Sequence, residues 1–266
     1  MGDKDSGIMK IAVTVAFLVM VLVNGLANAL PINGITTGQV SDAYPDLFAP
    51  AGITFSIWGL IYILLAAFVL YQWGLFQSDK GAAREDLFQT IGIYFIISSV
   101  ANTFWIFAWH YEVIWLSLVF MIVILLCLIQ IANQLRLETF SLKEKFFIRL
   151  PFSIYFGWIT VATIANVTTF LVSLGLQGFG TAQQFWMILV LFVGIAIGIA
   201  RMRYDHDLAY GLVFIWAYAG ILIKHISPAA FGGQFPAVIT AVIICLVILA
   251  VAKILFFFPG LKKFAS

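Results

Sequence analysis

Charge is what this sequence lacks most. Only 10% of its 266 residues are charged, whereas 63% are hydrophobic. An ordinary soluble domain carries roughly 25% charged residues. We therefore exclude a soluble globular protein and expect a chain that is surrounded by lipid. The net charge of +2 is small and gives no support to nucleic acid as a partner.

The sequence also lacks the residue sets that catalysis and metal binding require. Its two cysteines, Cys127 and Cys245, lie within apolar runs, where a thiol behaves as a small hydrophobic group. No Asp, Glu, Arg or His lies near the centre of such a run, where ion-coupled transporters hold a proton or a cation. Lys224 and His225 lie near the end of one run and give little support to a bound retinal or haem. We expect no catalytic residues, no metal ion and no required cofactor.

Long apolar runs dominate what is present. About 20 apolar residues in a helix span the hydrocarbon core of a bilayer. The runs lack the alternation of barrel strands, and helices pair every backbone group within the segment, as lipid requires. The sequence therefore predicts an all-α membrane protein with eight transmembrane helices, at approximately residues 9–30, 51–73, 89–109, 113–134, 151–174, 184–203, 209–226 and 237–258.

Basic residues are distributed unevenly between the loops. Of the 14 Lys and Arg residues, all except Lys224 lie in the N-terminal tail, in the connections 74–88, 135–150 and 201–208, or near the C-terminus. Loops rich in Lys and Arg stay in the cytoplasm. The sequence predicts a multi-pass protein of the cytoplasmic (inner) membrane with both termini in the cytoplasm.

The first span has a second interpretation. Lys4 and Lys10, the apolar stretch 11–23 and the "ANA" at residues 27–29 also resemble a signal peptide with its cleavage site. The charges of the later loops fit a cytoplasmic N-terminus in either case, so both interpretations stay open.

Aromatic and amide side chains recur inside three of the runs at helical spacings. Residues three or four apart are neighbours on a helix face, and this relates Trp58 to Tyr62 and Asn102 to Trp105. In the fifth span, Trp158, Ala162, Asn166 and Phe170 recur at about one helical turn. An amide inside lipid bonds either to a neighbouring helix or to a ligand, so packing and ligand binding both stay open from spacing alone. Tryptophans at the ends of runs are expected at the water interface: Trp73, Trp109, Trp115 and Trp186.

Three motifs of a known family occur in order along the chain. They are Pro50 directly before the second span with Trp58 and Tyr62 inside it, Asn102 and Trp105 in the third, and "WITVATIAN" at residues 158–166 in the fifth. They match a Pro-Pro-x-Trp-Val element followed by Trp and Leu-x-Tyr, then Asn-x-x-Trp, then W-V-x-F-A-T-x-L-N. Residues 1–174 therefore resemble the translocator protein family (TspO, tryptophan-rich sensory protein), whose members are five-helix membrane proteins.

The chain also departs from the family pattern. Ala49 replaces the first proline of the pair, Gly52 the tryptophan that follows, and Phe170 a further tryptophan. We expect a TspO-like bundle over residues 1–174, and three additional helices with a short cytoplasmic tail over residues 175–266. The resemblance also implies a homodimer, whose interface the added helices can cover or replace.

The resemblance implies a ligand-binding membrane protein. In the family, an outer-leaflet cavity under the first loop, here residues 31–50, is implicated in binding tetrapyrroles such as protoporphyrin and haem, sterols and aromatic drug-like molecules. The residues expected at this site are Trp58 and Tyr62 as an aromatic wall, Asn102 as the hydrogen-bonding group, Trp158 as the floor, and beside them Trp105 and Asn166.

Three functions stay open at this point. The first is a sensory, chaperoning or transport protein for a planar hydrophobic ligand. The second is an uncoupled transporter of a small neutral or amphipathic solute, which the three added spans suggest. The third is a light-dependent porphyrin-degrading enzyme. The expected partners are a hydrophobic small molecule (porphyrin, haem or sterol-like) and membrane lipid.

Overall fold

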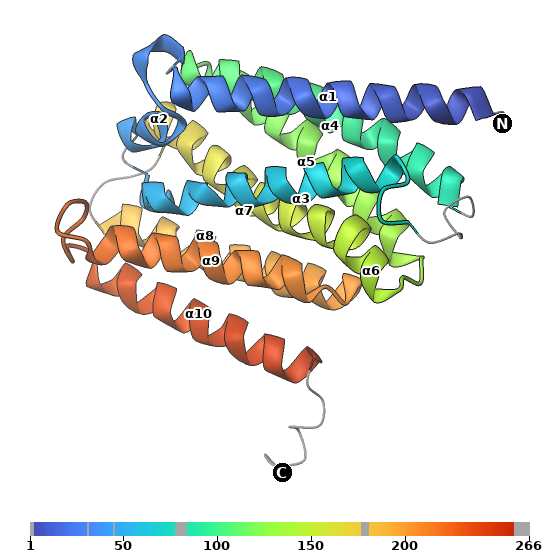
Figure 1. Ribbon diagram of the computed structural model, residues 1–266. Coiled ribbons are helices and arrows are strands. Elements are labelled where there is room, and N and C mark those ends of the chain that lie inside the picture. The colour runs from blue at the N-terminus through green and yellow to red at the C-terminus, as the bar shows by residue number, and fades with distance from the viewer. Residues whose placement is uncertain (1–2, 31, 45, 78–83, 177–180, 258–266) are drawn as a thin grey trace.

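The computed structural model describes residues 3–30, 32–44, 46–77, 84–176 and 181–257, and the regular elements in these ranges are helical (Figure 1). The long helices are α1 (Asp3–Ala29), α3 (Ile57–Gln72), α4 (Glu85–His110), α5 (Ile114–Arg136), α7 (Leu150–Ser173), α8 (Thr181–Asp205), α9 (Leu208–Ile226) and α10 (Pro236–Phe257). The short elements are η1 (Ile32–Gly34), α2 (Thr37–Ala43), η2 (Gly52–Ser56), α6 (Leu142–Glu144) and the π-helical turn η4 (Lys145–Arg149).

The predicted spans are confirmed. Within the described ranges, eight helices are long and apolar enough to cross a membrane. The fifth is longer than expected, because α6 and η4 continue directly into α7 to give one helical stretch from Leu142 to Ser173. The all-α fold follows from the solvent, because in lipid a helix satisfies its own backbone groups.

The helices form one bundle. α1 packs on α4, α4 on α5, and α5 on α7. α9 contacts α7 and also contacts α8 and α10. α1 and α10 consequently lie on opposite sides of the bundle (Figure 1).

α7 and α9 come close together at a glycine. A Cβ atom on Gly157 would lie 2.9 Å from Cβ of Val213 and 3.0 Å from the carbonyl oxygen of Tyr210. Across the same contact, the Tyr210 hydroxyl donates to Oγ1 of Thr160 at 3.1 Å. Small residues permit such packing in lipid, where the hydrophobic effect does not drive helices together. The last three helices therefore pack directly on the first five.

α1 has two different faces. Ile11 and Val15 are exposed, as side chains toward lipid are, whereas Asn24 is buried. Trp73, which follows α3, donates its indole N–H to Oγ1 of Thr14 at 2.9 Å. α1 thus packs as a helix of the bundle against both α3 and α4.

The connection between α1 and α3 covers one end of the bundle, as expected. We call residues 32–44 and 46–56 the cap segment, and the end that it covers the cap end (Figure 1). α2 begins with a capping box, in which Thr36 and Gln39 each accept the other's backbone N–H. α2 contacts α4, and η2 contacts α9, so the cap segment touches both halves of the chain.

Candidate ligand-binding site

Trp58, in the first turn of α3, is the centre of an aromatic cluster next to the cap segment. Its ring stacks on Tyr62, with centroids 5.6 Å apart and planes 24° apart, as the four-residue spacing predicts. The rings of Trp105 on α4 and of Tyr155 and Trp158 on α7 lie 6.2, 6.0 and 6.3 Å from Trp58. Rings at such separations attract one another in tilted and edge-to-face arrangements. The cluster therefore joins three helices.

A small cavity lies beside this cluster, and we call it the aromatic cavity. Its volume is about 40 Å³. One water needs roughly 10–15 Å³, so in this conformation the cavity admits a few waters but no planar ring system. Its walls come from α3, α4, α5, α7 and the cap segment: Ser41, Pro50, Phe55, Trp58, Trp105, Trp109, Met121, Trp158, Val161, Ala162, Ala165, Asn166 and Thr169.

Two hydrogen-bond donors in the cavity wall have no acceptor. Trp105 and Trp158 are 4% and 2% exposed. Their indole N–H groups find no partner among the residues that the structure describes. A buried donor without an acceptor costs roughly 1–3 kcal/mol. Both unpaired donors thus belong to residues of the cavity wall.

Asn166 also lines the cavity, but its amide is engaged by the protein. It exchanges hydrogen bonds with the hydroxyl of Ser117 on α5, at 3.2 Å in each direction. Asn166 therefore ties α7 to α5 at the cavity wall.

Asn102 lies outside the cavity lining. It is fully buried. Its Oδ1 accepts from Nδ2 of Asn24 at 2.7 Å, and its Nδ2 donates to the hydroxyl of Tyr155 at 3.4 Å. The three-residue spacing from Trp105 turns the two side chains about 60° apart around α4, which lets Trp105 reach the cavity while Asn102 faces α1 and α7.

The expected site is thus only partly assembled around the cavity. Of the predicted residues, those in the cavity wall are Trp58, Trp105, Trp158 and Asn166. Tyr62 contacts the cavity indirectly, because it supports the ring of Trp58. The cap residues Ser41, Pro50 and Phe55 were not predicted as wall residues, and only the proline of the family motif pointed to them.

The prediction that Trp109 anchors the water interface is wrong. Trp109 is 5% exposed and lines the cavity. Its indole N–H donates to the carbonyl oxygen of Thr37 at 3.1 Å. The cap segment folds over the end of α4 and buries this ring, which its place at the end of an apolar run does not reveal. The other three tryptophans at span ends are exposed, as expected: Trp73, Trp115 and Trp186.

α9 holds the cap segment through two polar side chains. Nζ of Lys224 lies 2.7 Å from Oδ1 of Asp42. Nε2 of His225 lies 2.9 Å from the carbonyl oxygen of Leu47 and donates to it. Both residues thus bind the cap segment, which the sequence did not predict.

The middle of α9 holds the other side of the cap segment. Ala51 donates its backbone N–H to the carbonyl oxygen of Gly220 at 3.0 Å. The indole N–H of Trp216 donates to the carbonyl oxygen of Thr54 at 3.0 Å. No spacing in the sequence pairs Trp216 with a partner, because Thr54 lies far away along the chain.

The comparisons with known proteins agree with this architecture. A family model described as TSPO-like protein matches residues 10–255. The match runs from α1 to α10 and includes the three C-terminal helices, beyond the motifs in residues 1–174. No curated protein and no solved structure shows significant similarity to the chain. Because the match covers most of the sequence and all eight membrane-length helices, this integral membrane protein belongs to the TSPO-like protein family.

Proposed function

We propose that this protein binds a planar hydrophobic ligand in the aromatic cavity, with a tetrapyrrole such as protoporphyrin or haem as the first candidate. The observation that carries the proposal is the pair of unpaired indole N–H groups, on Trp105 and Trp158, in a wall otherwise made of rings, apolar side chains and three polar side chains, Ser41, Asn166 and Thr169. A flat ring system offers its face to Trp58, and its carboxylate oxygens accept from the indoles. A sterol-like ligand would use the same donors through its oxygen.

Binding requires the cavity to open. At about 40 Å³ it is far smaller than the roughly 300–1,000 Å³ of most ligand pockets. Ser41, Pro50 and Phe55 of the cap segment form part of the wall, so displacement of this segment enlarges the cavity. The ligand then selects the open conformation, and its apparent affinity is lowered by the fraction of closed protein.

We also propose that the cap end faces the outside of the cytoplasmic membrane. Lys224 lies at the cap end, whereas the opposite end carries Arg84, Arg136, Arg149, Arg201 and Arg203, which fits basic loops in the cytoplasm. In intact cells a membrane-impermeant maleimide should label Gln234→Cys, and should label Ser141→Cys only after permeabilisation. The reverse pattern would refute this orientation.

The proposed function is tested by titrating the protein in lipid nanodiscs with protoporphyrin, followed by the porphyrin absorbance. We expect saturable binding at micromolar ligand. Trp58→Ala, which removes the stacking ring, should weaken binding about tenfold or more, a loss of about 1.4 kcal/mol. Trp158→Phe should have a smaller effect, because it removes the N–H and keeps most of the ring surface.

The matched control is Trp115→Phe, since Trp115 is exposed and does not line the cavity. Its affinity for protoporphyrin should equal that of the wild type. Absence of saturable binding, or equal affinities for all three variants, would overturn the proposal. Uptake of the porphyrin by reconstituted vesicles would add transport, and its bleaching in light would add degradation, to the binding activity.

A further inference from the structure

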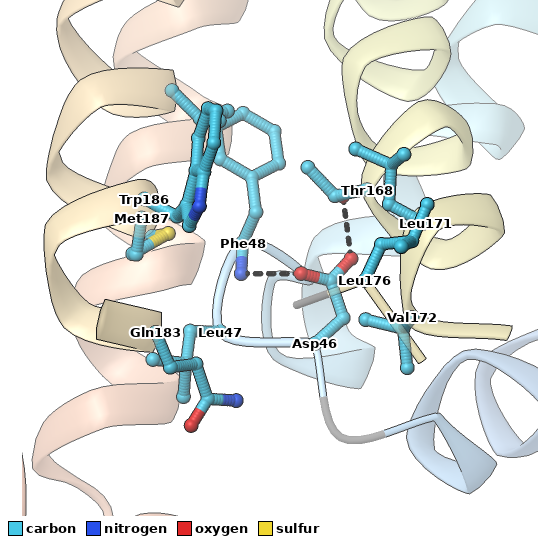
Figure 2. Close-up of a pocket in the computed structure, with 11 residues that line it drawn as sticks. Asp46, Leu47, Phe48, Thr168, Leu171, Val172, Leu176, Gln183, Trp186 and Met187 are labelled. Atoms are coloured by element: carbon cyan, nitrogen blue, oxygen red, sulfur yellow. Dashed lines mark hydrogen bonds between the residues drawn. The ribbon is translucent and has the colours of Figure 1, made fainter. Parts of the chain in front are cut away.

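A second pocket opens at the cap end between α7 and α8 (Figure 2). Its volume is about 360 Å³, within the range of roughly 300–1,000 Å³ typical of small-molecule sites. It shares no lining residue with the aromatic cavity. Its wall is apolar except for a few side chains, and consists of Asp46, Leu47, Phe48, Thr168, Leu171, Val172, Leu176, Gln183, Trp186, Met187 and Val190.

A buried carboxylate forms part of this wall. Asp46 is only 5% exposed. Its Oδ1 accepts the backbone N–H of Phe48 at 2.9 Å, and its Oδ2 accepts the hydroxyls of Thr168 at 2.6 Å and Thr169 at 3.4 Å. Figure 2 shows the carboxyl group between Phe48 and Thr168, with Trp186 of α8 across the pocket. Two short hydrogen bonds therefore hold Asp46 in place, one from the backbone N–H of Phe48 and one from the hydroxyl of Thr168.

The charge of this carboxylate is not balanced by a contact ion pair in the described ranges. The cation that acts on it electrostatically, Lys224, is bonded to Asp42 at 2.7 Å. Burial raises the pKa of Asp46 above its ordinary value of 3.8, because the ionised form loses its hydration. The donated hydrogen bonds and Lys224 oppose this shift only in part. A cation in the pocket would complete the compensation.

We propose that this pocket binds a lipophilic amine, a molecule with a protonated nitrogen on an apolar body. The ammonium pairs with Asp46 in a water-poor setting, where such charge-assisted hydrogen bonds are strong. The exposed ring of Trp186 attracts the cation through its face and covers the body. Leu171 and Met187 complete the apolar wall from α7 and α8.

Charge selects this ligand over the other amphiphiles that a membrane offers. A fatty acid or a phosphate group would bring a second negative charge to Asp46, which costs free energy in a low-dielectric site. A neutral chain fills the apolar part but leaves Asp46 uncompensated. The amine alone uses both parts of the pocket.

The test compares three probes with the same chain: decylamine, decanol and decanoate. Their binding to the protein is measured by equilibrium dialysis, in nanodiscs of zwitterionic lipid. We expect saturable binding of decylamine with one molecule per protein. Asp46→Asn should weaken decylamine binding by at least about tenfold and leave the weaker decanol binding unchanged. Decanoate should bind weakest to the wild type.

Two further variants keep the test decisive. Glu112→Gln removes an exposed carboxylate at the same end of the bundle and should leave decylamine binding unchanged. Val190→Trp fills the pocket and should abolish binding of both decylamine and decanol, even if Asp46→Asn fails to fold. Equal weakening by Glu112→Gln would show general surface attraction and overturn the proposal. Decylamine binding that survives Val190→Trp would show partition into lipid and would also overturn it.

Discussion

Asn102 shows how a polar side chain inside a membrane is satisfied by the protein itself. Its amide joins Asn24 on α1 to Tyr155 on α7, so one residue of α4 links three helices. An amide without partners in lipid costs several kcal/mol on apolar-solvent scales. The bonds of Asn102 therefore contribute to helix association, and both ends of its amide have protein partners.

Asn102→Ala should consequently destabilise the folded protein and leave its affinity for the ligand nearly unchanged. We expect a loss of about 0.6–2 kcal/mol in the free energy of unfolding, the range of hydrogen bonds between transmembrane helices. Protoporphyrin affinity should stay within about twofold of the wild type, because Asn102 does not line the aromatic cavity. A twofold change in affinity corresponds to about 0.4 kcal/mol in binding free energy. Thermal unfolding and the absorbance titration measure the two quantities.

Asn24→Ala is the matched control for this bond. The double variant should be hardly less stable than the worse single variant, because both substitutions break the same bond. A large loss of affinity with unchanged stability would mean that Asn102 turns toward the ligand in the open conformation.

The raised pKa of Asp46 predicts that the stability of the protein depends on pH when no amine is bound. Its pKa is raised in the folded state above the ordinary 3.8, so the folded protein binds this proton more tightly than the unfolded chain. The stabilisation by the proton is fully present below pH 3.8 and is lost as the pH rises through the folded-state pKa. The unfolding midpoint of the wild type, measured relative to Asp46→Asn, should fall over this rise in pH. A relative midpoint that climbs with pH would show that the neighbouring donors and Lys224 outweigh burial.

Spacing within one helix predicted some side-chain relations and not others. The stack of Trp58 on Tyr62 was predictable, because both residues lie on one helix and four residues define one face. The roles of Asn102 and Trp105 were not, because spacing does not fix how α4 is rotated toward its neighbours. The unpaired N–H of Trp158 could not be predicted either, because it depends on where the other helices place their hydrogen-bond acceptors.

At the scale of elements, α9 fastens the cap segment. Its middle and its end bond to four different residues of that segment: Asp42, Leu47, Ala51 and Thr54. All four contacts join residues far apart in the sequence. The apolar length of α9 therefore predicted a transmembrane span, but nothing in the sequence predicted that α9 holds the cap segment. The close approach depends on Gly220, which faces η2.

Gly220→Ala should therefore loosen the cap segment. The added Cβ would lie 2.0 Å from Oγ1, 2.8 Å from Cγ2 and 2.9 Å from Cβ of Thr54, so rotation of the threonine side chain cannot relieve the clash. Overpacking of this kind costs about 1–3 kcal/mol. We expect a lower unfolding midpoint and faster hydrogen exchange over residues 46–56.

Gly59→Ala makes the same chemical change in α3, where no heavy atom lies within 4 Å of the new Cβ. It should be neutral or stabilising by up to about 1 kcal/mol, because alanine favours helix over glycine. Similar destabilisation by both substitutions would show that the contact of α9 with η2 is not the cause.

At the scale of the whole molecule, the low charge and the long apolar runs predicted the eight helices. A chain surrounded by lipid must pair its backbone groups internally, and helices do this within each span. These features did not predict how the last three helices join the first five. That junction includes Gly157 against Val213 and the hydrogen bond from Tyr210 to Thr160. Neither contact leaves a periodic signal in the sequence, since each relates residues on separate helices.

This junction predicts that the chain can be cut between α7 and α8 and still assemble. Residues 1–176, produced alone, lack every contact of α9 with the cap segment and expose the Gly157 face of α7 to lipid. We expect this fragment to unfold at a lower temperature than the whole protein and to show fast exchange in the cap segment. Co-expression with residues 177–266 should restore both properties, because preformed transmembrane helices associate through packing and polar contacts without a covalent link.

Gly157→Leu in the first fragment provides the control for this reassembly. A leucine side chain cannot fit where a Cβ alone would lie 2.9 Å from Val213, so the second fragment should no longer co-purify. If residues 1–176 alone matched the stability and cap exchange of the whole protein, α8–α10 would be an appendage. If they match only after the second fragment is added, the stability of the cap segment over the aromatic cavity depends on α8–α10.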